Sequence, residues 1–125
     1  MTNGGKTYDL EPRLITLGVK VIQLSESLPS GKGVTHLSGQ LIRSGTAPAL
    51  IYGEAQEAES IKDFLHKMKL CLKELRESSI CLKMLDELGV LDGNSYSQFV
   101  KSEVGELILI FSKSISTAKK NSILH

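Results

Sequence analysis

Residues 61–88 read IKDFLHKMKLCLKELRESSICLKMLDEL and carry the clearest helical signal in the chain. Positions three and four apart form one inward face, as they do on an amphipathic α-helix. That face consists of Ile61, Phe64, Met68, Cys71, Leu75, Ser78, Leu82 and Leu85. Ser60 and Asp63 resemble a capping box, and Gly89 is typical of a C-terminal cap. The pattern predicts a single long helix over residues 61–88.

The preceding segment, residues 34–57, repeats the pattern with smaller side chains. Its inward face consists of Leu37, Leu41, Ser44, Pro48, Ile51 and Ala55. The small residues in the middle would allow a neighbouring backbone to approach closely. Pro48 removes a hydrogen bond to the Ser44 carbonyl, and its ring crowds that turn. We therefore expect one helix with a kink near Ser44 to Pro48, and not two separate helices.

The two ends of the chain carry further helical patterns. Residues 9–28 have an apolar stripe at Leu10, Leu14, Leu17, Val21, Leu24 and Leu28, which Ile15 and Ile22 are expected to widen. Residues 95–118 have a stripe at Val100, Val104, Leu107, Phe111, Ile115 and Ala118. Asp9 and Ser95 are the predicted N-caps of these helices. Residues 119–125 are expected to form a frayed tail.

Short polar loops separate the predicted helices, and a short loop makes consecutive helices antiparallel neighbours. The composition agrees with a helical fold, because Trp is absent and aromatic residues make up only 5% of the chain. A length of 125 residues is that of one domain. The sequence therefore predicts an all-α fold, an antiparallel up-and-down four-helix bundle that forms a single domain over residues 1–125.

The sequence carries no recognisable membrane or export signal. No apolar run approaches the ~18 residues of a membrane span, and the polar N-terminus, Met1 to Tyr8, lacks a basic-then-apolar pattern. We therefore expect a cytoplasmic protein with no membrane partner. A net charge of +1 gives no overall attraction to nucleic acid, so any charge-based function depends on local arrangement.

Residues that could support catalysis are few and scattered. His36, His66 and His125 have no neighbours at metal-binding spacing. Cys71 and Cys81 do not form a CxxC motif, and on one helix they would lie about 15 Å apart, too far for a disulfide. We expect no catalytic residues, no metal site and no cofactor.

One face of the 61–88 helix is rich in basic residues. This face consists of Lys62, His66, Lys69, Lys73, Arg76 and Lys83, roughly opposite the apolar stripe. It could follow a nucleic-acid backbone, because phosphate contacts come from Lys and Arg and need no specific base. It could equally be a solvated face with local ion pairs such as Asp63 with Lys67 and Lys73 with Glu77.

The run Leu107 to Phe111 is apolar at every position and so covers all faces of its helix. A lone bundle buries one stripe of each helix, and the remaining side chains would be exposed to water. The predicted interface between subunits consists of Leu70, Ile80, Met84, Ile108, Leu109 and Ile110. The alternative is a wide core face with scattered exposed apolar residues, which are common on monomers.

Three polar residues flank the apolar stripe of the 34–57 helix: Gln40, Arg43 and Glu54. Arg43 and Glu54 are too far apart along the helix to pair directly. Each therefore needs a partner on another helix or subunit, because a half-buried charge is retained only when it is paired. We interpret these residues as structural.

Four stretches together resemble a known bacterial family. They are Gln40–Ala49, Tyr52–Ala55, Lys62–Lys67 and Leu72–Glu77. The chain is similar to the four-helix bundle family first noticed in intervening sequences of 23S ribosomal RNA, in which most members have no known activity. The resemblance implies an up-and-down bundle and, from known relatives, a ring-shaped homopentamer. A ribosomal label attached to this family reflects where the gene was found.

A more distant resemblance is to the accessory protein of diversity-generating retroelements. It implies a basic pentamer that binds nucleic acid and reverse transcriptase, although that relative is markedly more positive than this chain. One position also departs from the main family, because many members have Asn where this chain has Ile51. The sequence therefore predicts two kinds of partner. One is further copies of the same chain, and the other is RNA or DNA.

Overall fold

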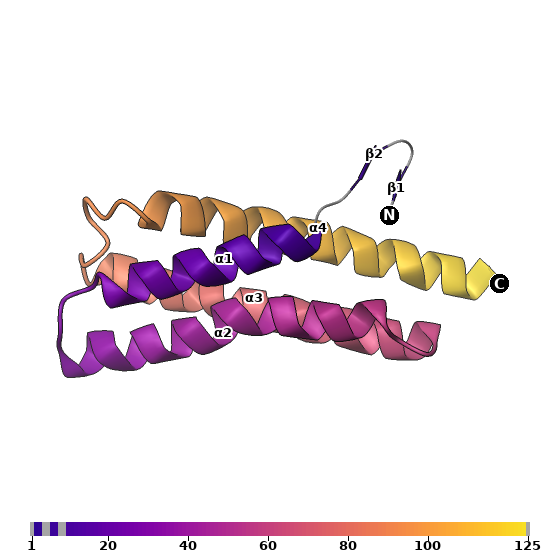
Figure 1. Ribbon diagram of the computed structural model, residues 1–125, viewed down its shortest axis with the longest axis horizontal. Coiled ribbons are helices and arrows are strands. Elements are labelled where there is room, and N and C mark those ends of the chain that lie inside the picture. Colours follow the sequence, from indigo (N-terminus) through magenta and orange to yellow (C-terminus); the bar gives the residue numbers. More distant parts are fainter. Residues whose placement is uncertain (1, 4–5, 8–9, 125) are drawn as a thin grey trace.

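The computed structural model describes residues 2–3, 6–7 and 10–124. Its helices are α1 (Leu10–Glu26), α2 (Lys32–Gln56), α3 (Ile61–Glu87) and α4 (Ser97–Leu124). Two short strands precede them, β1 (Thr2–Asn3) and β2 (Lys6–Thr7), which pair antiparallel. Consecutive helices run in opposite directions along one long axis (Figure 1). The predicted antiparallel four-helix bundle is confirmed.

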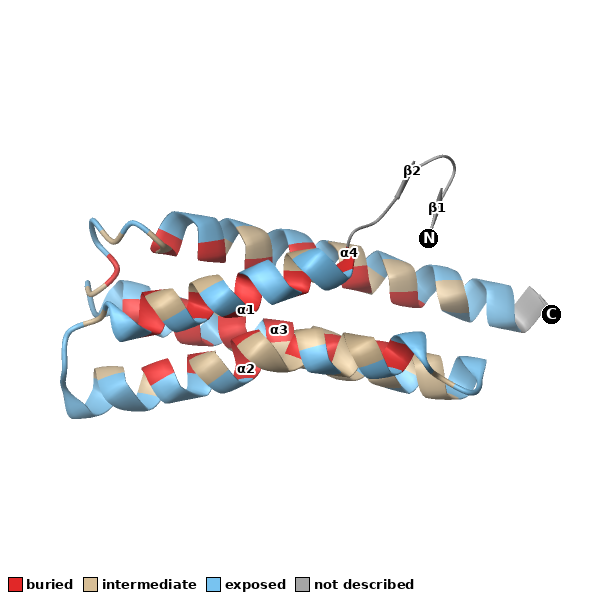
Figure 2. Ribbon diagram, viewed as in Figure 1, coloured by how far each residue is buried: buried red, intermediate tan, exposed pale blue. Residues whose placement is uncertain are grey.

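The helices pack in chain order around one core. α2 packs closely against α1 and α3, and α3 packs against α4, whereas α1 and α4 touch at fewer places. The backbones of α1 and α3 do not approach each other closely within residues 10–124, and these two helices are therefore diagonal to each other. Buried residues follow the inward sides of all helices (Figure 2). The largest fully buried side chains include Phe111, Leu14, Leu17, Leu41, Met68 and Leu75.

The closest approach between α1 and α2 occurs at small residues. A Cβ atom built on Gly45 would lie 2.8 Å from Val21 Cγ2, which is closer than non-bonded carbon atoms approach each other in proteins. A Cβ on Gly18 would lie 3.5 Å from Thr46 Cγ2. Only glycine at position 45 permits this spacing, which confirms the predicted close packing of the backbones.

Pro48 lies inside α2, which is one continuous helix as predicted. Buried hydroxyls and a thiol pack around this point of the α2–α3 interface. Ser44 Oγ and Ser78 Oγ lie 2.8 Å apart, and Cys71 Sγ donates to the Pro48 carbonyl at 3.6 Å. Burial raises the pKa of the Cys71 thiol to about 12, which keeps it protonated and able to donate.

The helix ends agree with the sequence in part. Ser60 Oγ accepts a hydrogen bond from the Asp63 amide at 3.0 Å, and Gly89 has a φ of 77° just beyond α3. The prediction for Ser95 is wrong, because α4 begins at Ser97. Asn94 organises the turn instead, and its Oδ1 accepts from the Tyr96 amide at 2.9 Å. Asp9, the other predicted cap, lies outside the described residues.

Two further predictions about helices need correction. Residues 119–124 are helical and not a frayed tail, because α4 continues through Leu124 without a Gly or Pro to stop it. This end of α4 extends beyond the loop between α2 and α3 (Figure 1). Ile15 and Ile22 do not widen the buried stripe of α1, since they are 53% and 37% exposed.

Candidate functional site

The basic face of α3 is fully open to solvent. Its members are all exposed: Lys62, His66, Lys69, Lys73, Arg76 and Lys83. Within residues 10–124 none of these side chains forms an ion pair. The expected local pairs on α3 are absent there, because Lys67 pairs with Glu54 and Glu77 pairs with Arg43. The Lys and Arg side chains of this face are therefore exposed without ion-pair partners in residues 10–124.

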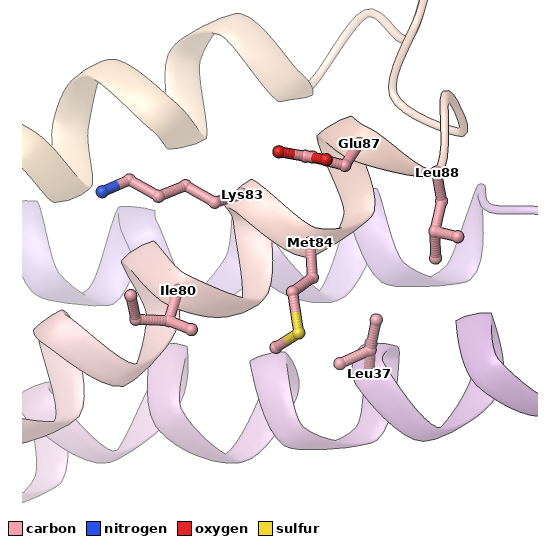
Figure 3. A pocket seen from close by; sticks show the side chains of 6 residues that line it. All are labelled: Leu37, Ile80, Lys83, Met84, Glu87 and Leu88. Atoms are coloured by element: carbon pink, nitrogen blue, oxygen red, sulfur yellow. The ribbon is translucent and has the colours of Figure 1, made fainter.

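The same face of α3 becomes apolar toward its C-terminal end. Ile80, Met84 and Leu88 are 53%, 44% and 57% exposed and follow one another at helical spacing. We call these three residues the α3 patch. They line a shallow depression of about 480 Å³ with Leu37 of α2, while Lys83 and Glu87 form its charged edge (Figure 3).

A second depression continues from the first between α2 and α3. It has a volume of about 580 Å³, shares Leu37, Ile80 and Met84 with the first, and extends to Gln40 and Arg76. The two depressions together form one open groove, which we call the α2–α3 groove. Its floor is apolar, and most of the charged side chains along it are basic.

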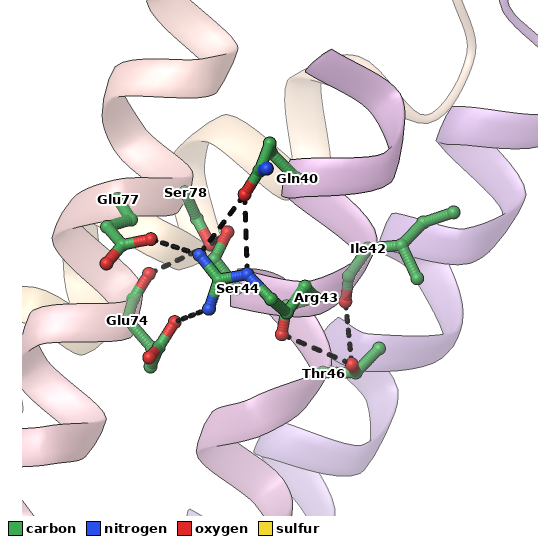
Figure 4. Close-up of polar contacts among 8 residues, drawn as sticks. All are labelled: Gln40, Ile42, Arg43, Ser44, Thr46, Glu74, Glu77 and Ser78. Atoms are coloured by element: carbon green, nitrogen blue, oxygen red, sulfur yellow. Dashed lines mark hydrogen bonds and ion pairs between the residues drawn. The ribbon is translucent and has the colours of Figure 1, made fainter. Parts of the chain in front are cut away.

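A polar cluster lies beside this groove, at Arg43 (Figure 4). The Arg43 guanidinium donates to Glu77, to Glu74 Oε1 at 2.9 Å and to Gln40 Oε1 at 3.3 Å. The hydrogen bond to Glu77 is the main cause that raises the pKa of Arg43. Glu54, farther along α2, accepts from Lys67 Nζ at 2.7 Å. The predicted partners on another helix are thus supplied by α3, and the cluster ties α2 to α3.

The apolar run of α4 is largely accommodated by the bundle itself. Ile108 and Ile110 are partly buried and pack against the core, and Leu70 on α3 is also partly buried. Only Leu109 is strongly exposed, at 71%. Of the predicted interface residues, Ile80, Met84 and Leu109 are therefore the ones with substantial free apolar surface.

Sequence reasoning missed an exposed apolar row on α1. It consists of Ile15, Val19 and Ile22, of which Val19 is 48% exposed, and we call it the α1 row. Exposed Glu11 and Glu26 lie one turn before it and one turn after it. The spacing of four and three was visible in the sequence, but it could not show which flank of the core stripe another helix covers.

In the described part of the chain, residues that commonly bind metals are dispersed and the cysteines are buried. Within the described residues, no group of three or more His, Cys, Asp or Glu side chains could hold a metal ion. Both cysteines are buried free thiols, and burial raises the pKa of each.

No helix in residues 10–124 has the length and hydropathy required to cross a bilayer.

Comparison with known proteins identifies a solved structure with a similar fold. No protein-family model matches the chain, and no curated protein matches it. Among solved structures, a protein of unknown function from the S23 ribosomal protein family of Bacteroides thetaiotaomicron has the same fold. The two are 23% identical with a TM-score of 0.76, over 85% of this chain and 97% of the other. This chain therefore shares its four-helix fold with a protein assigned to the S23 ribosomal protein family.

Proposed function

We propose that this protein is a non-enzymatic, homo-oligomeric four-helix bundle that acts as an assembly or binding scaffold. The observation that carries the proposal is the pair of exposed apolar surfaces, the α1 row and the α3 patch, on the outer sides of two diagonal helices. Each groups three aliphatic or thioether side chains at helical spacing. Grouped apolar residues of this kind favour contact with another protein, whereas isolated ones do not.

The energetics favour an assembly in which each subunit uses both surfaces. Complete burial of an aliphatic side chain contributes ~1.5–3 kcal/mol, and a side chain that is already half covered contributes about half of that. Association costs roughly 4–15 kcal/mol in lost translational and rotational freedom. The free energy gained when one contact buries six such side chains is comparable with this cost. A closed ring gains a second contact for each subunit, and the resemblance to the intervening-sequence family implies a ring of five.

Size-exclusion chromatography with light scattering tests the proposal. The expected result is a single species with the mass of five 13.6-kDa subunits. Another closed oligomer would support self-assembly but contradict the pentamer. A monomer at micromolar concentration would contradict the proposal as a whole.

The second candidate function is nucleic-acid binding by the basic face of α3. The observation in its favour is that Lys62, Lys69, Lys73 and Arg76 are exposed and form no ion pair within the described residues. From Lys62 to Arg76 the helix rises about 20 Å, enough to contact several successive phosphates. RNA or DNA affinity that is measurable and falls with salt is the result that this function requires.

A further inference from the structure

We propose that the subunits join head to tail, with the α1 row of one copy seated in the α2–α3 groove of the next. This inference rests on the proposed self-association and identifies the two surfaces that meet. It names the occupant of the groove as Ile15, Val19 and Ile22 from a second copy. The surfaces that they contact are Leu37 and the α3 patch.

The two surfaces cannot cover each other within one chain. The α1 row is exposed on the outer side of α1, and the α3 patch is exposed on the diagonal helix, whose backbone α1 does not approach closely within residues 10–124. Both surfaces are therefore available to other copies at the same time. A subunit that offers one of each can accept one neighbour at the groove and contact another through the row.

The shapes of the two surfaces match. The α1 row is a single line of side chains, and the helix rises about 10 Å between Ile15 and Ile22. The α3 patch rises about 12 Å between Ile80 and Leu88, and Leu37 forms the opposite wall of the depression. A single ridge of side chains that enters a groove between two helices is the usual geometry of helix packing.

The charges around the surfaces select this pairing. Glu11 and Glu26, at the two ends of the row, are exposed and form no ion pair in the described chain. The groove has Lys73, Arg76 and Lys83 along it, also exposed and unpaired there. Its carboxylates are fewer, Glu87 and Glu77, and Glu77 is held by Arg43.

Symmetric pairing of either surface with itself would bring like charges together. Two rows packed antiparallel place Glu11 of one copy beside Glu26 of the other. Two grooves that face each other bring their lysines and arginines close together. Like charges across an interface disfavour a complex, whereas a row in a groove brings opposite charges into contact. The contact is therefore between different surfaces, and such contacts generate closed rings or open filaments.

Mixing two variants tests this pairing directly. Val19→Lys disables the row but leaves the groove intact, and Met84→Lys disables the groove but leaves the row intact. Lysine is used in both, so that the two altered surfaces cannot attract each other. Leu50→Lys is the matched control, since Leu50 is more exposed than either residue and lies outside both surfaces.

The expected result is that each lysine variant alone is a monomer, while their equimolar mixture forms a species of two subunits. That species joins the one intact row to the one intact groove and cannot extend further. The Leu50→Lys protein keeps the mass of the wild type. Circular dichroism confirms that both variants fold, and Ile80→Lys replaces Met84→Lys if the latter does not.

Other outcomes separate this inference from the proposed function. An oligomeric wild type with Val19→Lys or Met84→Lys variants of unchanged mass overturns the head-to-tail contact and leaves self-assembly standing. Folded monomeric variants that stay monomeric when mixed at high concentration also overturn it. A monomeric wild type removes the proposed function together with this contact.

Discussion

Gly45 on α2 lies directly against Val21 on α1, with space for a hydrogen atom but not for a methyl group. A Cβ atom at position 45 would approach Val21 Cγ2 to 2.8 Å and Cγ1 to 2.9 Å. Val21 is itself fully buried, so it has no room to move away. The separation of α1 and α2 therefore depends on this one glycine.

Replacement of Gly45 by alanine is expected to destabilise the fold by about 1–3 kcal/mol, the usual cost of one extra methyl in a packed core. The measurement is the free energy of unfolding in urea. Gly53→Ala is the matched control, because Gly53 lies in the same helix and a Cβ atom built there meets nothing within 4 Å. It should raise stability by about 0.4–1 kcal/mol. Equal effects of the two substitutions would show that α1 and α2 can shift apart freely.

Removal of the Arg13 guanidinium is expected to loosen α1 from α4. Arg13 donates to Glu103 at 2.8 and 2.9 Å and to Glu106 at 2.9 Å, and the hydrogen bond to Glu103 is the main cause that raises its pKa. These bonds bridge two neighbouring helices that pack against each other at few places. Arg13→Met should cost about 1 kcal/mol in the free energy of unfolding, partly because the Glu103 side chain, only 12% exposed, is left unpaired.

A double-mutant cycle isolates this interaction. Arg13→Met combined with Glu103→Gln should cost less than the two single substitutions added together, with a coupling of about 0.5–1 kcal/mol. Arg76→Met serves as the control, since Arg76 is exposed and forms no ion pair within residues 10–124. Additive effects of the Arg13 and Glu103 substitutions would contradict a bridging role.

The sequence predicted what depends on local pattern and failed where the outcome depends on which helix lies opposite. The buried stripe of α1, the cap at Ser60 and the glycine at the end of α3 follow from spacing and turn chemistry. By contrast, Ile15 and Ile22 look like core residues until the position of α2 is known. For the same reason the spacing on α3 suggests a local pair of Lys67 with Asp63, whereas Lys67 pairs with Glu54 across the α2–α3 interface.

The candidate site was predicted in the same uneven way. The basic face of α3 could be found from sequence because all of its residues are on one helix. The groove beside it could not, because Leu37 and Ile80 come from two helices and their proximity requires the fold. The α1 row was missed because exposure depends on the absence of a neighbour.

Cys71 is expected to make the folded state less stable as pH rises above about 9. Burial raises its pKa from 9.0 to about 12 in the folded protein. Below pH 9 both states hold the proton, and stability is independent of this group. Between pH 9 and 12 the unfolded chain releases the proton while the folded chain retains it, so stability falls by at most ~1.4 kcal/mol per pH unit.

The measurement compares wild type with Cys71→Ala, because lysines and tyrosines titrate in the same window. The difference in the free energy of unfolding between the two proteins should narrow as pH rises from 9 to 11. A thiol reagent provides an independent check, since the cysteines should react slowly in the native protein and quickly in urea. Rapid reaction of the native protein at pH 8 would contradict the burial of Cys71.

Reversal of charge on the α3 face tests the second candidate function. The combined variant Lys62→Glu and Lys69→Glu, on the part of the face outside the α2–α3 groove, should reduce affinity for a generic RNA at least tenfold and flatten the dependence of log K on log salt, because two phosphate contacts are lost. The measurement is fluorescence anisotropy with a labelled RNA over a range of salt concentrations.

Lys119→Glu with Lys120→Glu is the matched control, since both are exposed lysines on a different helix and the change in net charge is the same. If both double variants weaken binding equally, the effect comes from total charge and not from the α3 face. If only the α3 variant loses affinity while its mass in light scattering is unchanged, the basic face of α3 binds nucleic acid without any change in assembly.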